Sequence, residues 1–299
     1  MNKVIVVVGP TGVGKTKLSI ELAKYYHGEV INADAMQVYQ ELNIGTAKIT
    51  EDEKERIPHH LFDIKKVTEE YSIYQYQKDC RQKIKEILAR GNTPILVGGT
   101  GLYIKSSLYD YKLNETKENT DQYDNLSTEE LYQQLIELDT KAWNKIDKNN
   151  RRRIINAIIY YKQNHTSITE NKTDKLLYDA VFIGLTTSRD NLYQIINQRV
   201  DKMIESRLLQ EVESFYQQKI FTKPLIGGIG YKELYQYFDK QVSLEEAIDN
   251  IKRNSRRYAK RQYTFFNHQL PVIWFETDYK DFTNTVNKVC SYLDNQSKI

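Results

Sequence analysis

A glycine-rich turn near the start of the chain constrains its fold more than any other feature. Residues 9–16 are GPTGVGKT, which matches the pattern G-x-x-x-x-G-K-[ST], and they lie between the β-branched run 4–8 and an amphipathic stretch that ends at Tyr25. This order predicts a buried strand, a phosphate-binding loop and a helix, and it argues against a simple tight turn. The backbone N–H groups of such a loop and the helix N-terminus attract anions. Lys15 adds a full positive charge, and Thr16 is a candidate ligand for Mg²⁺.

The rest of the chain alternates strand and helix patterns, which predicts an α/β protein. Further short strands are expected at 29–33, 93–97, 181–185 and 272–275, with a helix at 74–90 between the first two. Later helical patterns cover 192–216, 231–238 and 244–266. Strands that alternate with helices favour a parallel sheet joined by right-handed crossovers. We therefore expect a P-loop NTPase-like parallel sheet core.

Residues 113–178 differ from this core in composition. The chain is acidic and polar to about residue 139 and then becomes basic, with helical periodicity at 131–138 and 154–161 and no strand signal. We expect an inserted all-helical domain over 113–178, and a core made of residues 1–112 and 179–299 with C-terminal helices.

The composition of the chain limits the class of protein but does not identify its binding partners. The formal net charge of the 299 residues is only +3, so charge has to be considered locally. Cys80 and Cys290 are far apart and form no metal-binding spacing, which favours a reducing compartment. No apolar run is long enough to span a bilayer, and the N-terminal run ends in the glycine turn rather than in a cleavage site. We expect a cytoplasmic protein that does not bind a membrane, with a monomer as the default state.

An acidic residue follows the second strand and not the third. ATP-handling P-loop proteins usually carry an apolar strand that ends in a magnesium-binding acid. Here the strand 93–97 continues into Gly-Gly-Thr-Gly, whereas Asp34 follows the strand 29–33. A carboxylate at that place faces the same crevice as the loop. Asp34 is therefore a candidate metal ligand through water or a candidate base, and a turn or helix-capping residue is the alternative.

One face of a C-terminal helix is strongly basic. Between 251 and 266 six cations recur at helical spacing without an acid among them, opposite an apolar stripe. The cations are Lys252, Arg253, Arg256, Arg257, Lys260 and Arg261, and the stripe that we expect to face the core is Ile251, Tyr258, Ala259, Tyr263 and Phe266. A solvated helix face usually mixes both signs of charge, so this face predicts binding to nucleic-acid phosphates. A second basic cluster, 151–153, lies in the insertion.

Together these stretches resemble the tRNA dimethylallyltransferases, the IPP transferase (tRNA isopentenyltransferase) family. The stretches that carry the resemblance are GPTGVGKT at 9–16, NADAMQVYQELNIGTAK at 32–48, PHHLFD at 58–63, VGGTGLY at 97–103, LYQIINQRVDKM at 192–203, IGYKEL at 229–234 and RRYAKRQYTFF at 256–266. They follow the family order over nearly the whole chain. The resemblance implies transfer of a dimethylallyl group from dimethylallyl diphosphate to N6 of the adenosine just 3′ of the anticodon, position 37, of a tRNA.

The resemblance also assigns roles to residues. On this view the loop holds a diphosphate leaving group through Gly9, Pro10, Thr11, Gly12, Val13, Gly14, Lys15 and Thr16, with Mg²⁺ on Thr16. Asp34 matches the family's general base, and Arg199 matches an arginine that stabilises the departing diphosphate together with Lys15 and Thr11. The implied contacts to the tRNA anticodon stem-loop are Asp34, Ala35, Met36, Gln37, Thr100, Arg152, Arg153, Asn156, Arg256, Arg257 and Lys260.

The chain departs from the family pattern at several positions. The residues concerned are Asn150, Asn156 and Ile159 in the insertion, Ile195 one turn before Arg199, and Gly227 before the IGYKEL stretch. These departures concern the details of tRNA contact. Two other activities stay open from the residues alone: a P-loop kinase of a small metabolite, and prenyl transfer to a free adenine nucleotide. A pure RNA-binding module would leave the P-loop unexplained.

Overall fold

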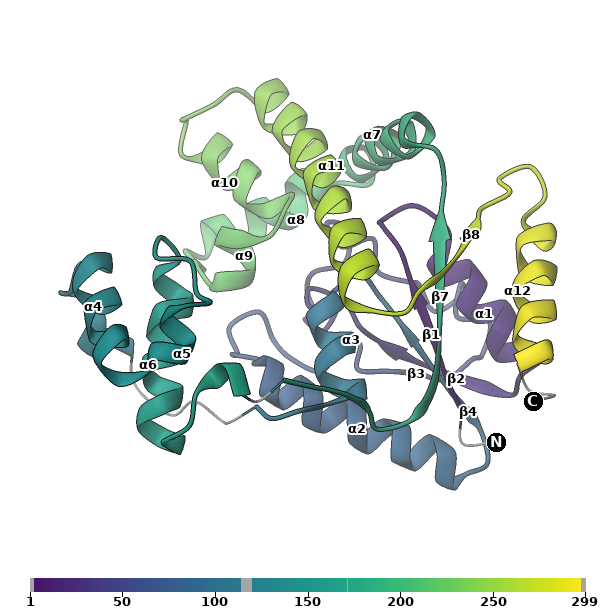
Figure 1. Ribbon diagram of the computed structural model, residues 1–299. Helices are drawn as coiled ribbons and strands as arrows, with labels where there is room; N and C mark the ends of the chain where they lie inside the picture. The colour runs from purple at the N-terminus through teal and green to yellow at the C-terminus, as the bar shows by residue number, and fades with distance from the viewer. Residues whose placement is uncertain (1–2, 114–119, 171, 297–299) are drawn as a thin grey trace.

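The computed structural model describes residues 3–113, 120–170 and 172–296, and it has an α/β core with a peripheral group of helices (Figure 1). The core sheet is six-stranded and parallel, with the strand order β3-β2-β4-β1-β7-β8. Its strands are β1 (Lys3–Val8), β2 (Gly28–Asn32), β3 (His59–His60), β4 (Thr93–Val97), β7 (Asp179–Thr186) and β8 (Ile273–Glu276). The predicted α/β class and parallel sheet are confirmed.

Helices cover the sheet and bury its apolar strands. The core helices are α1 (Lys15–Tyr25), α2 (Ile73–Ala89), α3 (Gly101–Leu108) and α12 (Phe282–Gln296). The central strand β1 is apolar from Val4 to Val8 because both of its faces are covered there, and its alternate residues enter two different hydrophobic clusters. Helix α2 begins at a capping box in which Ser72 and Gln75 satisfy each other's backbone N–H groups. The packed core sheet therefore supports the loops at its carboxyl edge.

A second group of helices stands over that edge of the sheet (Figure 1). These helices are α7 (Arg189–Glu205), α8 (Leu208–Gln217), α9 (Lys223–Gly227), α10 (Tyr231–Phe238) and α11 (Leu244–Gln269). We expected continuous helical periodicity over 192–216, but this region forms two separate helices, α7 and α8. Arg207 adopts a left-handed conformation with φ of 73°, and the next residue, Leu208, is fully buried. Packing of Leu208 explains why the chain tolerates the unfavourable backbone conformation there.

The insertion has a hydrophobic cluster of its own. It contains η1 (Thr120–Tyr123), α4 (Thr128–Leu138), α5 (Thr140–Trp143), α6 (Arg151–Asn164) and η2 (Ile168–Glu170), and Figure 1 shows α4, α5 and α6 grouped to one side of the sheet. Leu131, Leu135 and Ile158 are completely buried in this cluster. At its end the structure differs from our expectation. Strand β6 (Lys172–Leu176), in the range that we expected to be helical, pairs antiparallel with β5 (Tyr109–Tyr111). The strand is short and polar, so its sequence carries no alternation that would reveal it.

None of the described helices combines the length and the apolar composition that crossing a membrane requires.

Candidate active site

A cavity of about 530 Å³ opens at the carboxyl edge of the sheet. Its floor comes from the loops after β1, β2 and β4, and its walls come from α7, α11 and the segment around α9 and α10. Thr11, Lys15, Asp34 and Arg199, which the sequence singled out from three distant segments, all line it. The crevice at the carboxyl ends of parallel strands is the usual ligand site of such folds.

The glycine-rich loop has the backbone shape of a phosphate cradle. Gly12 and Gly14 have φ angles of 87° and 92°, in the left-handed region that favours glycine. A Cβ atom on Gly14 would lie 2.8 Å from the ring of Phe282, so α12 packs directly behind the loop. Thr11, Lys15 and Thr16 line the cavity. The other predicted loop residues, Gly9, Pro10, Gly12, Val13 and Gly14, are not part of the cavity wall and build the turn behind it.

Two cations face this part of the cavity. The Lys15 ammonium donates a hydrogen bond of 2.7 Å to the carbonyl oxygen of Pro10. Burial and the nearby charge of Arg199 lower the pKa of Lys15 to about 7, although the carboxylate of Asp34 opposes the shift. Burial also lowers the pKa of Arg199, again against the effect of Asp34. Two mutually repelling, desolvated cations create a strong preference for an anionic ligand.

Asp34 is held at the end of β2 by a local turn. Its Oδ1 accepts a hydrogen bond of 2.9 Å from the backbone N–H of Met36, and its own N–H donates to Oδ1 of Asn32 at 2.9 Å. The Asn32 side chain in turn donates to the carbonyl oxygens of Asp34 and Leu61. This is the turn role that we considered as the alternative, but it uses only one carboxylate oxygen. Oδ2 accepts no hydrogen bond from the described residues and is available to a substrate.

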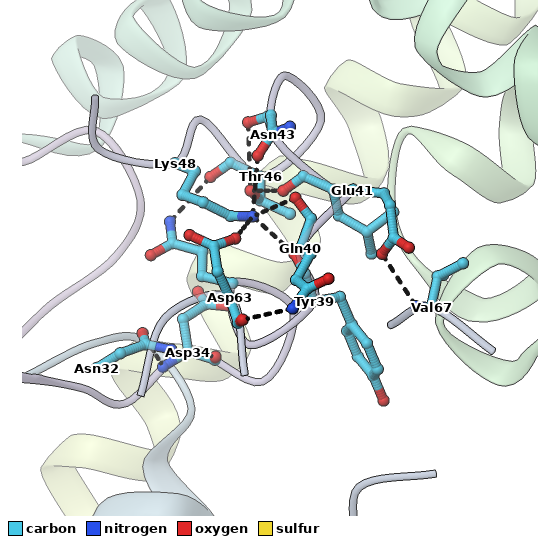
Figure 2. Close-up of polar contacts among 12 residues, drawn as sticks. Asn32, Asp34, Tyr39, Gln40, Glu41, Asn43, Thr46, Lys48, Asp63 and Val67 are labelled. Carbon is cyan, nitrogen blue, oxygen red and sulfur yellow. Dashed lines mark hydrogen bonds and ion pairs between the residues drawn. The ribbon is translucent and has the colours of Figure 1, made fainter. Parts of the chain in front are cut away.

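The segment after Asp34 lines part of the cavity, and the Lys48 side chain fixes it by polar contacts (Figure 2). The Lys48 ammonium donates to the carbonyl oxygen of Tyr39 at 2.6 Å, to Oδ1 of Asn43 at 2.9 Å and to the Asp63 carboxylate at 2.5 Å. Its side chain is only 6% exposed, so these oxygen atoms replace water around the charge. Lys48 thus ties the loop to the segment that follows β3.

The predicted contacts near Asp34 have distinct environments. Met36 and Gln37 line the cavity, and Gln37 Nε2 donates to the carbonyl oxygen of Thr46 at 3.1 Å. Ala35 and Thr100 do not line it. The N–H of Ala35 donates to Oγ1 of Thr100 at 3.0 Å, which joins the loop after β2 to the start of α3. Their visible role is to fix the Asp34 turn.

Helix α11 contributes residues whose place sequence reasoning missed. We assigned Tyr258 to a core-facing stripe, but it lines the cavity together with Arg261 and Gln262, because the inner face of α11 passes from the core onto the site. Burial, with a smaller effect of Asp34, raises the pKa of Tyr258 to about 12. Gln262 is 5% exposed, and a polar residue among apolar neighbours of a helix is the signal that could have identified it.

Of the predicted phosphate-binding cations of α11, Arg261 lines the cavity, whereas Arg256, Arg257 and Lys260 lie outside it. Arg257 and Lys260 are exposed, and Arg256 donates to Oδ1 of Asn197 at 2.6 Å and lies over the ring of Tyr193. Lys252 forms an ion pair of 2.6 Å with Asp201 on α7. Among the described residues, the positive charge of the basic face is therefore paired with an acid near the start of the helix and is not paired toward its middle.

The predicted cations of the insertion also lie on an exposed surface. Arg152, Arg153 and Asn156 are exposed on one face of α6. Arg151 differs from them because its guanidinium donates to the carbonyl oxygens of Tyr123 and Leu126, at 2.5 Å each. Arg151 thus stabilises the insertion itself.

Comparison with known proteins assigns the chain to a family. Residues 37–269 match the family model described as IPP transferase. The chain belongs to the IPP transferase family. The resemblance seen in the sequence is confirmed.

Curated relatives of this IPP transferase match it over nearly the full length of both chains. A tRNA dimethylallyltransferase of Anoxybacillus flavithermus is 48% identical over 98% of this chain and 96% of its own. A protein of the same name from Macrococcus caseolyticus is 46% identical over 98% and 97%.

Solved structures of similar proteins share the fold. The tRNA isopentenylpyrophosphate transferase of Bacillus halodurans has a TM-score of 0.75 and 41% identity, and the match covers 100% of this chain and 99% of that one. A eukaryotic dimethylallyltransferase, described as acting on tRNA, has a TM-score of 0.88 and 31% identity over 98% of this chain and 78% of its own.

The departures from the family pattern have local structural consequences in this IPP transferase. Ile195 packs against the phosphate loop, since a Cβ on Gly12 would lie 2.6 Å from its Cγ2. Asn150 caps α6 by accepting a hydrogen bond from the N–H of Arg153. Ile159 is 2% exposed and belongs to the core of the insertion. Gly227 lines the cavity, and a Cβ there would contact nothing within 4 Å.

Proposed function

We propose that this protein transfers a dimethylallyl group from dimethylallyl diphosphate to N6 of adenosine 37, next to the anticodon of a tRNA, and releases diphosphate. The observation that carries the proposal is that Lys15, Arg199 and Asp34 line one cavity, where the Asp34 carboxylate acts electrostatically on both cations and uses only Oδ1 in its turn. The names of the full-length relatives support the same activity.

The donor half of the reaction breaks the bond between C1 of the dimethylallyl group and the diphosphate oxygen. Positive charge develops on the allylic carbon while negative charge accumulates on the leaving oxygens. Lys15 and Arg199 stabilise that negative charge together with backbone N–H groups of the glycine-rich loop, and Thr11 lies beside them. Because both cations are already desolvated, they need little reorganisation when the charge develops.

The acceptor half forms the bond between N6 of adenine and C1. The exocyclic amine loses one proton in the process, and Oδ2 of Asp34 takes it. An adenine reaches this half-buried carboxylate in the cavity only after it leaves the base stack, which an anticodon loop permits more easily than a duplex does. Met36 and Gln37 contact the flipped base on the floor of the cavity.

The tRNA backbone is held by the two exposed cationic faces. Arg257 and Lys260, with Arg256, bind phosphates near the cavity, and Arg152, Arg153 and Asn156 bind the stem from the insertion. Ala35 and Thr100 act by supporting the Asp34 turn. We expect the protein to act as a monomer in the cytoplasm, where both of its buried cysteines stay reduced.

The site fits a magnesium ion that is held mainly by its substrate. The described residues contain no group of three or more His, Cys, Asp or Glu side chains that could hold a metal alone. Mg²⁺ keeps several waters and binds through few protein ligands plus substrate phosphates, and the exposed Thr16 hydroxyl beside Lys15 suits that role. Bound there, the ion would neutralise diphosphate charge.

The alternatives fit the site less well. A small-metabolite kinase would need an acid after β4, where this chain has Gly98 and Gly99, which line the cavity without a carboxylate. Transfer to a free nucleotide would leave the cationic faces of α6 and α11 without a role.

An assay with labelled dimethylallyl diphosphate and Mg²⁺ distinguishes between these activities. The protein is offered unmodified tRNA with adenine at position 37, the same tRNA with guanine there, or AMP. We expect label only on the first. Label on AMP alone would contradict tRNA as acceptor, and ATP hydrolysis or phosphoryl transfer without prenyl transfer would support the kinase.

A further inference from the structure

Glu211 on α8 holds a loop that belongs to a distant part of the chain. Its Oε2 accepts hydrogen bonds from the backbone N–H groups of Asn43 at 3.1 Å and Ile44 at 2.8 Å. Its Oε1 accepts from the N–H of Gly45 at 3.1 Å and from the hydroxyl of Tyr231 at 2.6 Å. One carboxylate thus gathers three successive amides and a phenol, an arrangement that binds anions strongly.

The loop that Glu211 holds carries an acceptor for cavity side chains. The carbonyl oxygen of Thr46, the residue after Gly45, accepts hydrogen bonds from Arg199 Nη2 and from Gln37 Nε2, at 3.1 Å each. Arg199, Gln37 and Thr46 all line the cavity, whereas Glu211 does not. The position of the Thr46 carbonyl therefore sets the direction in which Arg199 points.

Close packing between Tyr231 and Gly45 fixes the loop against Glu211. Tyr231 is fully buried, and a Cβ on Gly45 would lie 2.6 Å from its ring, so the loop backbone packs directly on the phenol. Burial and then the charge of Glu211 raise the pKa of Tyr231 far above its ordinary value. The phenol therefore keeps its proton and donates it in the hydrogen bond to Glu211.

We propose that Glu211 is a positioning residue for the reaction and that it acts through the Thr46 carbonyl on Arg199. The inference rests on the proposed function, because the task of Arg199 is to bind the diphosphate. The neighbours of Glu211 favour this role over a surface ion pair. Among the described residues its carboxylate has no Lys or Arg partner, and its hydrogen bonds go to the loop and to Tyr231.

The substitution Glu211→Gln tests the role with little change of shape. An amide NH₂ group cannot accept hydrogen bonds, so the hydrogen bonds to at least one of the two carboxylate oxygens are lost. We expect a loss of about tenfold to a hundredfold in kcat for prenyl transfer, the scale of a displaced catalytic group. Glu213→Gln is the matched control, because Glu213 lies on the same helix and, among the described residues, its side chain bonds only to Gln217. This control should retain wild-type kcat.

A double-mutant cycle with Arg199→Ala shows whether Glu211 acts through Arg199 or only stabilises the fold. The affinity for inorganic pyrophosphate, measured by calorimetry, should fall with Glu211→Gln in the wild type and hardly change with it once Arg199 is alanine. An equal loss in both backgrounds would overturn the inference, as would wild-type affinity and kcat in Glu211→Gln. If the wild type bound pyrophosphate but transferred no prenyl group, the proposed function would fail while this cycle still decided the role of Glu211.

Thermal unfolding shows whether the variants remain folded. If Glu211→Gln does not fold, Tyr231→Phe replaces it in the cycle, since it removes only one of the four hydrogen bonds. A smaller loss of pyrophosphate affinity that again depends on Arg199 would support the inference. A Tyr231→Phe variant with unchanged affinity would contradict it.

Discussion

Gln262 and Gly99 are joined by a buried hydrogen bond of 3.0 Å, from the side-chain amide on α11 to the carbonyl oxygen at the end of β4. A Cβ atom on Gly99 would lie 2.1 Å from Gln262 Nε2 and 4.0 Å from Oδ2 of Asp34. The basic helix therefore touches the carboxyl edge of the sheet at a point where no side chain fits. This contact joins the inner face of α11 to the loop after β4, next to Asp34.

Gly99→Ala should displace Gln262 and break this hydrogen bond. Loss of a buried hydrogen bond plus local crowding predicts a decrease of about 1–3 kcal/mol in the free energy of unfolding, with a decrease in activity. Chemical denaturation measures the first and the prenyl-transfer assay the second. Gly227→Ala is the control for stability, because nothing lies within 4 Å of a Cβ at that position. Equal stability of the two variants would contradict the prediction.

Binding of a diphosphate should be accompanied by proton uptake at Lys15. With a pKa of about 7 in the free site, Lys15 is largely neutral at pH 8, and a bound anion raises its pKa. The affinity for dimethylallyl diphosphate should therefore fall as the pH rises above 7. Calorimetry at pH 8 in two buffers of different ionisation enthalpy measures the uptake. Lys15→Arg should take up fewer protons, because arginine stays charged, and equal uptake would refute the assignment.

Asp34→Asn should remove the base and preserve the turn. The asparagine Oδ1 still accepts the hydrogen bond from the N–H of Met36, so the backbone has no reason to move. We expect single-turnover prenyl transfer to fall by about 10²–10⁴-fold, the usual contribution of a general base. The dissociation constant for tRNA should stay close to that of the wild type. A comparable loss of tRNA affinity would make Asp34 a recognition residue instead.

The features that sequence predicts well are those whose chemistry is local. The phosphate loop at 9–16 and the carboxylate after β2 follow from short patterns next to apolar strands, and the structure places both on one cavity. The role of Arg199 came only from the family resemblance, because an arginine on an amphipathic helix is usually a solvated side chain. Its environment depends on Thr46, which is 153 residues away.

Other site features depend on contacts that no local pattern encodes. Glu211 and Gln262 bond backbone groups of segments far away in the chain, so their sequence neighbourhoods resemble ordinary helix faces. Strand β6 is too short and polar to show alternation, and the break at Arg207 follows from burial of Leu208. In each case tertiary packing overrides a weak local preference.

Glu29 should make the protein sensitive to acid. Burial alone would raise the pKa of its carboxyl, but hydrogen bonds from Arg90, Asn92 and His60 outweigh burial and lower the pKa to about 2. This contribution to stability is complete above the ordinary pKa of an unfolded glutamate and is lost as the pH falls toward 2, which corresponds to about 3 kcal/mol. Glu29→Gln should therefore lower the free energy of unfolding at pH 7 and flatten its dependence between pH 5 and 2. If the free energy of unfolding of Glu29→Gln, measured by denaturation, fell with acid as steeply as that of the wild type, this prediction would be contradicted.

The cations in the middle of α11 should determine the salt dependence of tRNA binding. Arg257 and Lys260 are exposed and form no ion pair among the described residues, so each is free to displace a counterion from a phosphate. Lys252, on the same helix, is already paired with Asp201 and serves as the matched control. Each of Arg257→Ala and Lys260→Ala should reduce the slope of log affinity against log salt by about 0.7–0.9, whereas Lys252→Ala should change it less. Filter binding across a series of salt concentrations measures these slopes. Equal slopes for all three variants and the wild type would show that this face does not touch the tRNA backbone.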